Sequence, residues 1–338
     1  MTIYSWNSKA FKQLAQRAGS LPHALLIKGP PGIGKRAFAA ALAQGLLCEK
    51  PVSALAACGS CAACHWFDTE NHPDYRILQP EIADEADDAE GSDKKTKRDI
   101  SVAQVRSLAD FINISAHRGG AKVVVIQPAE AMNVNAANAL LKSLEEPPPG
   151  TYFLLVADRP HLLPATIRSR CQHVSLPAPT PQEAAAWLKT SGVSQPELAL
   201  AQAGGAPLLA VALDNVDYWA ARKQLLDGLS STAFDALALA ERVVTQPIPQ
   251  FINTLQRWSY DLACLSFGQP LRYNPDRKDA LLSATNRMKP LEILRFHREL
   301  VRFQRIVNHP LNARLLIEDM LLRYGQLMQR PETQHAAA

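Results

Sequence analysis

A glycine-rich loop between a predicted strand and a predicted helix constrains the fold of this chain more than any other feature. The segment LLIKGPPGIGKRAFAAAL, residues 25–42, fits the pattern G-x-x-x-x-G-K, with Gly29, Gly32, Gly34 and Lys35 at its centre. An apolar strand before it and a helix after it are the context that a phosphate-binding loop requires. The backbone N–H groups of such a loop curl around phosphate oxygens, and the helix N-terminus adds a favourable dipole. The alternative is a Gly/Pro-rich turn that only joins a strand to a helix.

Five short apolar runs predict strands, and helical patterns lie between them. The runs cover residues 24–27, 75–78, 123–126, 152–157 and 173–176. The third and fourth runs are apolar throughout, as strands covered on both faces are. The helical stretch 101–112 opens with Ser101 and Gln104, the pair that forms a capping box, and its periodicity predicts one buried face with Val102, Val105, Leu108, Ala109 and Ile112. This alternation predicts an α/β domain with a doubly wound parallel sheet.

Changes in composition indicate the domain boundaries. The α/β pattern covers residues 1–177, and a charged stretch at 81–98 within it predicts a flexible surface insert. Beyond this domain the pattern is helical. Residues 178–213 predict a small helical lid, residues 214–330 a second helical domain, and residues 331–338 a disordered tail.

The size and composition of the chain describe an ordinary soluble protein. It has 338 residues, a hydrophobic fraction of 47% and a formal net charge of +4, which by itself does not indicate a nucleic-acid footprint. No apolar run approaches the roughly 20 residues of a membrane helix, and the N-terminus lacks the pattern of a secretion signal. We therefore expect a cytoplasmic protein without membrane contact, whose six cysteines stay reduced.

The residues that hold magnesium in a phosphate-loop ATPase are missing. Arg36 stands directly after Lys35, where a Ser or Thr hydroxyl is expected to ligate Mg²⁺. A guanidinium offers no lone pair to a metal and repels it, although it can still pair with a phosphate. Gln127 and Pro128 follow the third apolar run in place of the expected acids, and Glu130 lies too far along to replace them. Hydrolysis is therefore not expected, and ATP binding by this degenerate loop is doubtful.

Four cysteines with metal-ligand spacing form a second motif. Cys48, Cys58, Cys61 and Cys64 are spaced C-x₉-C-x₂-C-x₂-C. Thiolates at this spacing can close a tetrahedron around Zn²⁺ and leave no open position for catalysis, so we expect a structural zinc site. The alternatives are free thiols, a redox pair, His65 as a substitute ligand, and an iron–sulfur cluster, for which nothing else in the sequence argues. Few basic residues surround the cysteines, which favours fold support or a partner contact over DNA binding.

Several longer motifs follow one another across residues 20–213. They are HALLIKGPPGIGK, the four-cysteine insertion, NHPDYRIL, ANALLKSLEEPPPGTYFLLVA and LLPATIRSRCQ. In this order they resemble the bacterial clamp-loader ATPase family, whose subunits open the sliding clamp of DNA polymerase III. The likeness is weaker in the helical part, at RWSYDLACLSFG and HPLNARLLIEDMLL. The resemblance implies an AAA+ P-loop parallel-sheet domain with a zinc insertion, a helical lid, and an all-α collar domain for oligomerisation.

Within that family, this chain is similar to a member that does not itself hydrolyse ATP. Active members keep a hydroxyl after the loop lysine, an acidic pair after the strand, and a lid arginine, at whose position this chain has Leu208. The family's Ser-Arg-Cys motif is intact, and the resemblance implies that its Arg170 projects into the ATP site of a neighbouring subunit as an arginine finger. Arg168 is the alternative finger, and a surface salt bridge is the alternative role for Arg170.

The resemblance also implies partners. These are the ATPase (gamma/tau) and delta subunits of the loader, with the sliding clamp and primed DNA reached through the complex. Any DNA polymerase (nucleotidyltransferase) activity belongs to that holoenzyme, because the sequence offers no pair of carboxylates suited to nucleotidyl transfer. Two functions compete with this one. The loop through Lys35 favours an active ATPase motor subunit, and the cysteines favour a zinc-bearing DNA-binding protein, which the near-neutral charge and the acidic insert disfavour.

Overall fold

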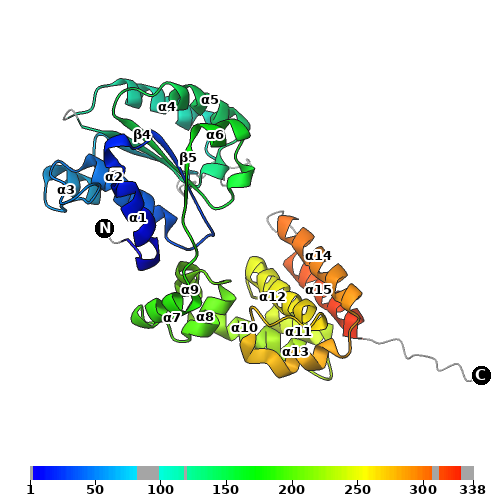
Figure 1. The fold of residues 1–338 in the computed structure, drawn as a ribbon. Helices are drawn as coiled ribbons and strands as arrows, with labels where there is room; N and C mark the ends of the chain where they lie inside the picture. The colour runs from blue at the N-terminus through cyan, green and yellow to red at the C-terminus, as the bar shows by residue number, and fades with distance from the viewer. Residues whose placement is uncertain (1–2, 82–98, 118–119, 307–311, 329–338) are drawn as a thin grey trace, which may run out of the picture. The chain divides into compact units, whose positions relative to one another are not determined.

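The computed structural model describes residues 3–81, 99–117, 120–306 and 312–328, and it divides the chain into two compact units (Figure 1). The first unit spans Met1–Pro179 and the second spans Thr180–Ala338. The predicted insert lies outside the described residues except for Glu81, and so does the predicted tail. The boundary predicted near residue 213, between the lid and the second helical domain, stays a prediction.

A five-stranded parallel sheet forms the centre of the first unit. Its strands are β1 (Ala24–Lys28), β2 (Tyr75–Leu78), β3 (Lys122–Ile126), β4 (Thr151–Ala157) and β5 (Gln172–Ser175). They lie in the order β2-β3-β4-β1-β5, and each neighbouring pair is parallel. All five strands expected from the sequence are confirmed, with ends that differ by one residue at most.

Helices cover both faces of this sheet. They are α1 (Ser8–Ala15), α2 (Lys35–Leu47), α3 (Ala62–Asp68), α4 (Val102–Asn113), α5 (Val134–Glu145) and α6 (Ala165–Arg170). The last three pack on strand residues such as Leu26 and Phe153, whereas the first three share a core with Leu25 and Leu154 on the other face. Because both faces are buried, the central strands are apolar except at their ends. The predicted α/β fold class is confirmed.

The sequence around α4 explains where this helix begins. Ser101 Oγ accepts a hydrogen bond of 3.2 Å from the Gln104 N–H, and Gln104 Oε1 accepts one of 2.8 Å from the Ser101 N–H. The predicted capping box is therefore formed. Val105 and Ile112 are buried as expected, but Ala109, which the pattern places on the same face, is exposed.

The segment between α2 and β2 carries the four cysteines and is held against α2. Leu55 and Phe67 of this segment join the core that α1 and α2 form with the sheet. Gly45 of α2 lets the backbone of Leu55 approach so closely that a Cβ atom at position 45 would clash with the Leu55 carbonyl oxygen. Glycine is thus required at this point of close approach.

The second unit has helices and no strand among its described residues, as predicted. They are α7 (Pro181–Thr190), α8 (Pro196–Gln202), α9 (Pro207–Leu213), α10 (Val216–Leu229), α11 (Ala236–Val243), α12 (Ile248–Ser266), α13 (Lys278–Thr285), α14 (Pro290–Ile306) and α15 (Ala313–Met328). Helices α7, α8 and α9 share a small hydrophobic cluster, and the six helices from α10 through α15 share a larger one.

Buried polar side chains connect these two clusters. Gln202 of α8 accepts a hydrogen bond of 3.0 Å from the Tyr218 hydroxyl of α10 and donates one of 3.1 Å to Asn274 Oδ1. Asn274 in turn donates from its backbone and its side chain to Asp261, a fully buried carboxylate of α12. Because these groups satisfy one another away from water, they fix α8 to α10 and α12.

No single helix in the described part of the chain is long and apolar enough to cross a membrane. Helices α8 and α9 meet the length and composition criteria only as a pair bent by 104°. Both helices contribute buried residues to the small hydrophobic cluster of the second unit.

We expect Gly45→Ala to lower the free energy of unfolding by about 1–2 kcal/mol. Overpacking a close contact costs about 1–3 kcal/mol, and the better helix propensity of alanine returns up to about 1 kcal/mol. Urea unfolding followed by circular dichroism measures the change. Gly19→Ala is the matched control, because a Cβ atom there meets nothing within 4 Å. Equal midpoints for both variants would contradict the close contact between α2 and the cysteine segment.

Candidate functional site

The glycine-rich loop lies between β1 and α2, as the sequence predicts. Gly32 and Gly34 have φ angles of 71° and 88°, in the left-handed region that favours glycine. A Cβ atom on Gly34 would clash with the ring of Tyr4, and one on Gly29 would clash with a carbonyl oxygen just after β5. No described side chain caps the start of α2. The loop therefore has the backbone shape that only its glycines permit.

Lys35 is buried, and three acceptors surround its ammonium group. Nζ donates to Gly29 O at 2.8 Å and to Pro30 O, and it forms an ion pair of 2.5 Å with Asp158 Oδ1. The side chain of Lys35 is 3% exposed, whereas that of Asp158 is 43% exposed. Because an ammonium group has three N–H donors, these partners occupy all of them.

The other residues around the loop offer little to a metal. Arg36 is exposed in the first turn of α2, and Gln127 and Pro128 follow β3 directly. Glu130 Oε1 accepts hydrogen bonds of 3.0 and 2.9 Å from the backbone N–H groups of the two residues after β4. The Glu130 carboxylate therefore binds backbone N–H groups at the end of β4 and does not replace the missing acids as a magnesium ligand.

Asp158 is the candidate that the sequence patterns missed. It is the first residue after β4, and β4 lies between β1 and β3. The carboxyl ends of parallel strands meet at one edge of a sheet, so an acid directly after any central strand can reach the loop after β1. The sequence therefore already showed an acid directly after a central strand. It was missed because the magnesium motif considers only the positions after β3.

Arg170 ends α6, and residues of its own unit hold its guanidinium. Nε donates to Glu145 Oε1 at 2.6 Å, Nη2 contacts the same oxygen, and Nη1 donates to Thr166 O at 3.0 Å and to Ser169 Oγ at 3.4 Å. A guanidinium has five N–H donors, so one is left without a partner among the residues that the structure describes. The side chain of Arg170 is 35% exposed. The nearby Arg168 differs, because its Nε is buried and has no hydrogen-bond partner among the described residues.

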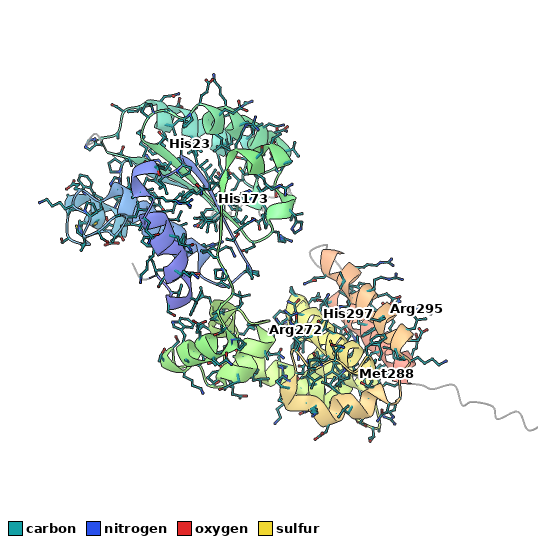
Figure 2. The ribbon with its side chains drawn as sticks, viewed as in Figure 1. His23, His173, Arg272, Met288, Arg295 and His297 are labelled. Carbon is teal, nitrogen blue, oxygen red and sulfur yellow. The ribbon has the colours of Figure 1, made fainter. Side chains whose placement is uncertain are left out.

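Two histidines labelled in Figure 2 hold the helix ends that carry this ion pair. His23 Nε2 and Leu144 O lie 2.9 Å apart, next to Glu145 at the end of α5. His173 of β5 has its Nε2 3.1 Å from Arg168 O, near the end of α6. His23, which directly precedes β1, and His173 thereby hold the ends of both helices, and with them the two charged side chains.

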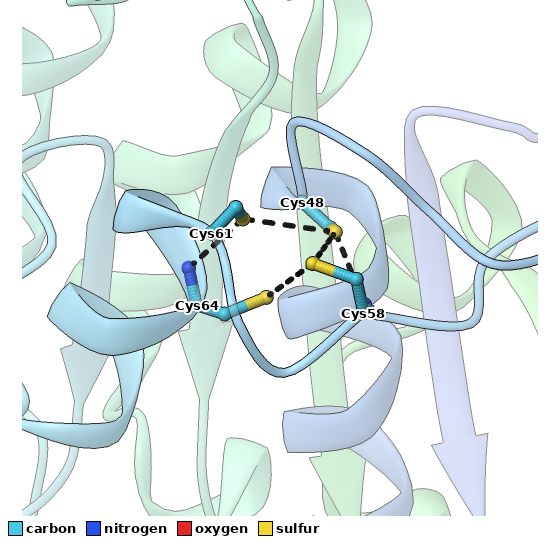
Figure 3. A group of neighbouring side chains, drawn as sticks. All are labelled: Cys48, Cys58, Cys61 and Cys64. Atoms are coloured by element: carbon cyan, nitrogen blue, oxygen red, sulfur yellow. Dashed lines mark hydrogen bonds between the residues drawn. The ribbon is translucent and has the colours of Figure 1, made fainter.

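The four predicted metal ligands meet in one cluster (Figure 3). The sulfur atoms of Cys48, Cys58, Cys61 and Cys64 all lie within 4.8 Å of one another. Cys48 Sγ lies 3.5 Å from Cys58 Sγ and 3.9 Å from Cys61 Sγ, and Cys58 Sγ lies 4.0 Å from Cys64 Sγ. Sulfurs at ~2.3 Å from a tetrahedral ion lie roughly 3.8 Å apart, so this set could hold a metal ion. His65 is exposed on α3 and is not part of the group.

Two of these thiols differ in acidity for opposite reasons. The backbone N–H and the hydroxyl of Ser60 donate to Cys58 Sγ, and these hydrogen bonds lower the pKa of Cys58 to about 6. Burial raises the pKa of Cys64 to about 12. The thiolate is the form that ligates a metal, so Cys58 offers a ready ligand at neutral pH, whereas Cys64 loses its proton only as the metal binds.

Comparisons with known proteins give a consistent family. Residues 6–180 match the family described as "DNA polymerase III, delta subunit", and residues 216–326 match its C-terminal counterpart. The chain is 36% identical to DNA polymerase III subunit delta' of Pseudomonas aeruginosa, over 96% of this chain and 98% of that protein. It is 34% identical to the subunit delta' of Escherichia coli, over 97% of each chain. A DNA polymerase III gamma subunit-related protein of Thermotoga maritima has a similar solved structure, with a TM-score of 0.42, 17% identity, and coverage of 95% of this chain and 100% of that one.

In the metal-free chain at pH 7, we expect iodoacetamide to label Cys58 first among the four clustered cysteines. A thiol with a pKa of about 6 is mostly ionised at pH 7, and its thiolate fraction falls about tenfold at pH 5, so labelling should slow by that factor. Cys64 should be slowest at both pH values. Mass spectrometry of the peptides measures the rates, and Ser60→Ala should slow the labelling of Cys58. Equal rates at all four cysteines would contradict the role of Ser60.

Proposed function

The chain belongs to the family of DNA polymerase III delta' subunits, and we propose that it acts as the delta prime subunit of the DNA polymerase III clamp loader. In this role it does not hydrolyse ATP, but it helps to load the sliding clamp on primed DNA in replication and supplies an arginine finger to a neighbouring ATPase subunit. One asymmetry carries the proposal. The residues that would ligate magnesium are missing, whereas the Ser-Arg-Cys motif of residues 169–171 is intact.

The residues around the loop favour a subunit that does not turn over ATP. Phosphoryl transfer needs Mg²⁺ held by a hydroxyl and a carboxylate beside the outer phosphates. Arg36 supplies no lone pair, and Gln127 and Pro128 replace the acids. The acid that does reach the site, Asp158, is paired with Lys35.

The position of Arg170 supports its role as the finger. Its guanidinium is planar and permanently charged, which suits it to offset the charge on a transferring phosphoryl group. It lies at the end of a helix, partly exposed, and its contacts leave a donor for a neighbour's phosphate. Arg168 is the weaker candidate, because its Nε is buried.

The helical region supports assembly with other subunits. Large apolar side chains are exposed on α14 and α15, at Leu291, Leu294, Val301, Leu315 and Leu322. Exposed apolar groups of this kind are typical of protein interaction surfaces. We infer that this region is the collar that joins the gamma/tau ATPase and delta subunits. The sliding clamp and primed DNA are then reached through the complex, in the cytoplasm.

The four cysteines are best explained as a structural zinc site. Four sulfur ligands complete a tetrahedral shell and leave no position for substrate, so the metal supports the fold. Cys48 follows α2, and Cys61 Sγ accepts a hydrogen bond of 3.5 Å from the Cys64 N–H at the start of α3. A bound zinc ion would therefore join the end of α2 to the start of α3.

In a reconstituted clamp loader, we expect Arg170→Ala to slow ATP-dependent clamp loading by at least about tenfold. An arginine finger is worth ~10³ or more at the site that it serves, while the other ATPase sites keep their own fingers. Arg170→Lys should not restore the rate, because an ammonium group lacks the planar fork of a guanidinium. Stopped-flow fluorescence of a labelled clamp measures loading.

Arg168→Ala is the matched control, since it removes the same charge from the same helix, and we expect it to load clamps at the normal rate. Both variants should keep the wild-type circular dichroism spectrum and assemble with the other subunits. An unchanged rate for Arg170→Ala would overturn the finger role. A slow Arg168→Ala beside a normal Arg170→Ala would assign that role to Arg168.

We expect the purified chain to contain about one zinc ion, and Cys64→Ser to lose it. Because metal binding contributes directly to folding, the urea midpoint of this variant should fall. Inductively coupled plasma mass spectrometry measures the metal. Cys264→Ser is the matched control, because Cys264 lies in α12, outside the cluster. Iron in place of zinc, or a metal-free chain of normal stability, would contradict the structural zinc site.

A further inference from the structure

The loop that would bind phosphate is filled by groups of this chain. Lys35 Nζ has three acceptors, Gly29 O at 2.8 Å, Pro30 O, and Asp158 Oδ1 at 2.5 Å. The ammonium group has only three N–H donors. A phosphate oxygen can therefore bind Lys35 only by displacing one of these acceptors.

Asp158 contacts Lys35 where a phosphate group would otherwise bind. The lysine of a phosphate loop reaches the outer phosphates of a nucleotide, and here a carboxylate from the end of β4 meets it instead. We propose that Asp158 is an internal latch, whose carboxylate replaces the phosphate on Lys35 and keeps nucleoside triphosphates out of the loop. The purpose of the latch in the assembled loader rests on the proposed function, a subunit that does not hydrolyse ATP. The latch itself involves only residues of this chain and can be tested on the isolated chain.

Apart from the latch, the loop is built to receive an anion. Gly32 and Gly34 keep the positive φ angles that let successive backbone N–H groups face one ligand. The first turn of the 13-residue helix α2 has no side-chain cap among the described residues. Two side chains near the N-terminus also hold the loop in place, because Trp6 Nε1 and Asn7 Nδ2 both donate to Ile33 O at 2.9 Å.

The latch can open without a change in the backbone. Glu130 Oε1 holds the N–H groups of Asp158 and Arg159 at 3.0 and 2.9 Å, which fixes the main chain at the end of β4. The Asp158 side chain is 43% exposed, so rotation of this one side chain into solvent frees Lys35. The barrier to nucleotide is therefore the charge and position of one carboxylate.

Charge explains why the closed state excludes nucleotide. A triphosphate carries several negative charges, and a carboxylate close to the same ammonium group repels it while competing for its protons. The apparent dissociation constant of a ligand also rises in proportion as the open fraction of the site falls. An amide in place of the carboxylate keeps the shape, removes the negative charge and weakens the bond to Lys35.

The test is titration of the isolated full chain with ATP by isothermal titration calorimetry, in buffer without magnesium and without a chelator, so that magnesium plays no part and any zinc on the four cysteines is kept. We expect Asp158→Asn to bind ATP at least about tenfold more tightly than the wild-type chain. Asp110→Asn removes one negative charge from the exposed surface of α4 and should bind like the wild type. The double variant Asp158→Asn/Lys35→Met should lose the gained binding. Asp158→Ser gives a second unlatched variant if the amide disturbs folding.

Equal affinity of the wild type and Asp158→Asn, whether strong or undetectable, would overturn the latch. A gain that survives Lys35→Met would also overturn it, because the nucleotide would then not be using the loop lysine. An equal gain in ATP affinity for Asp110→Asn would also overturn the latch, because the effect would then come from the net charge of the chain and not from the contact with Lys35. These titrations involve no other subunit, so their failure leaves the finger role of Arg170 standing, and failure of that role leaves the latch standing.

Discussion

Parallel pairing of β1 with β4 on one side and β5 on the other is the constraint on which the rest of the first unit depends. Leu25, Leu26 and Ile27 of β1 are fully buried, so this strand is covered by strands at both edges and by helices on both faces. Parallel strands end at a common edge. The glycine-rich loop after β1, Gln127 after β3 and Asp158 after β4 therefore lie at one edge of the sheet, although long stretches of sequence separate them.

The two ion pairs of this unit differ because their burial differs. The Lys35 side chain is 3% exposed, and a buried ammonium group is strongly destabilising without its partners, so its contacts are held firmly. Arg170 and Glu145 are 35% and 48% exposed, and an ion pair in that setting is worth little. The guanidinium can therefore exchange Glu145 for a group on another subunit at small cost, while the loop lysine stays closed. The difference in solvent exposure therefore supports the opposite roles that we propose for the two cations.

Helix α2 connects the loop to the cysteine cluster. It begins at Lys35 and ends at Leu47, directly before Cys48, so its two ends lie roughly 20 Å apart at 1.5 Å per residue. The close approach at Gly45 and the buried side chain of Leu55 hold the cysteine segment against this same helix. A metal at one end would stiffen the helix whose other end carries the glycine-rich loop.

The sequence by itself determined the five strands, the capping box of α4, the glycine-rich loop and the grouping of the four cysteines, because periodicity, capping and ligand spacing are local properties of a chain. Local patterns also placed Ala109 on a buried face, and they overlooked Asp158. Only the tertiary structure decided those two points, since the packing partners of a helix and the neighbours of a strand end are set by sheet order. Tertiary structure alone likewise brought Glu145 to Arg170 and a carboxylate to Lys35, because each of these contacts joins residues that no local pattern relates.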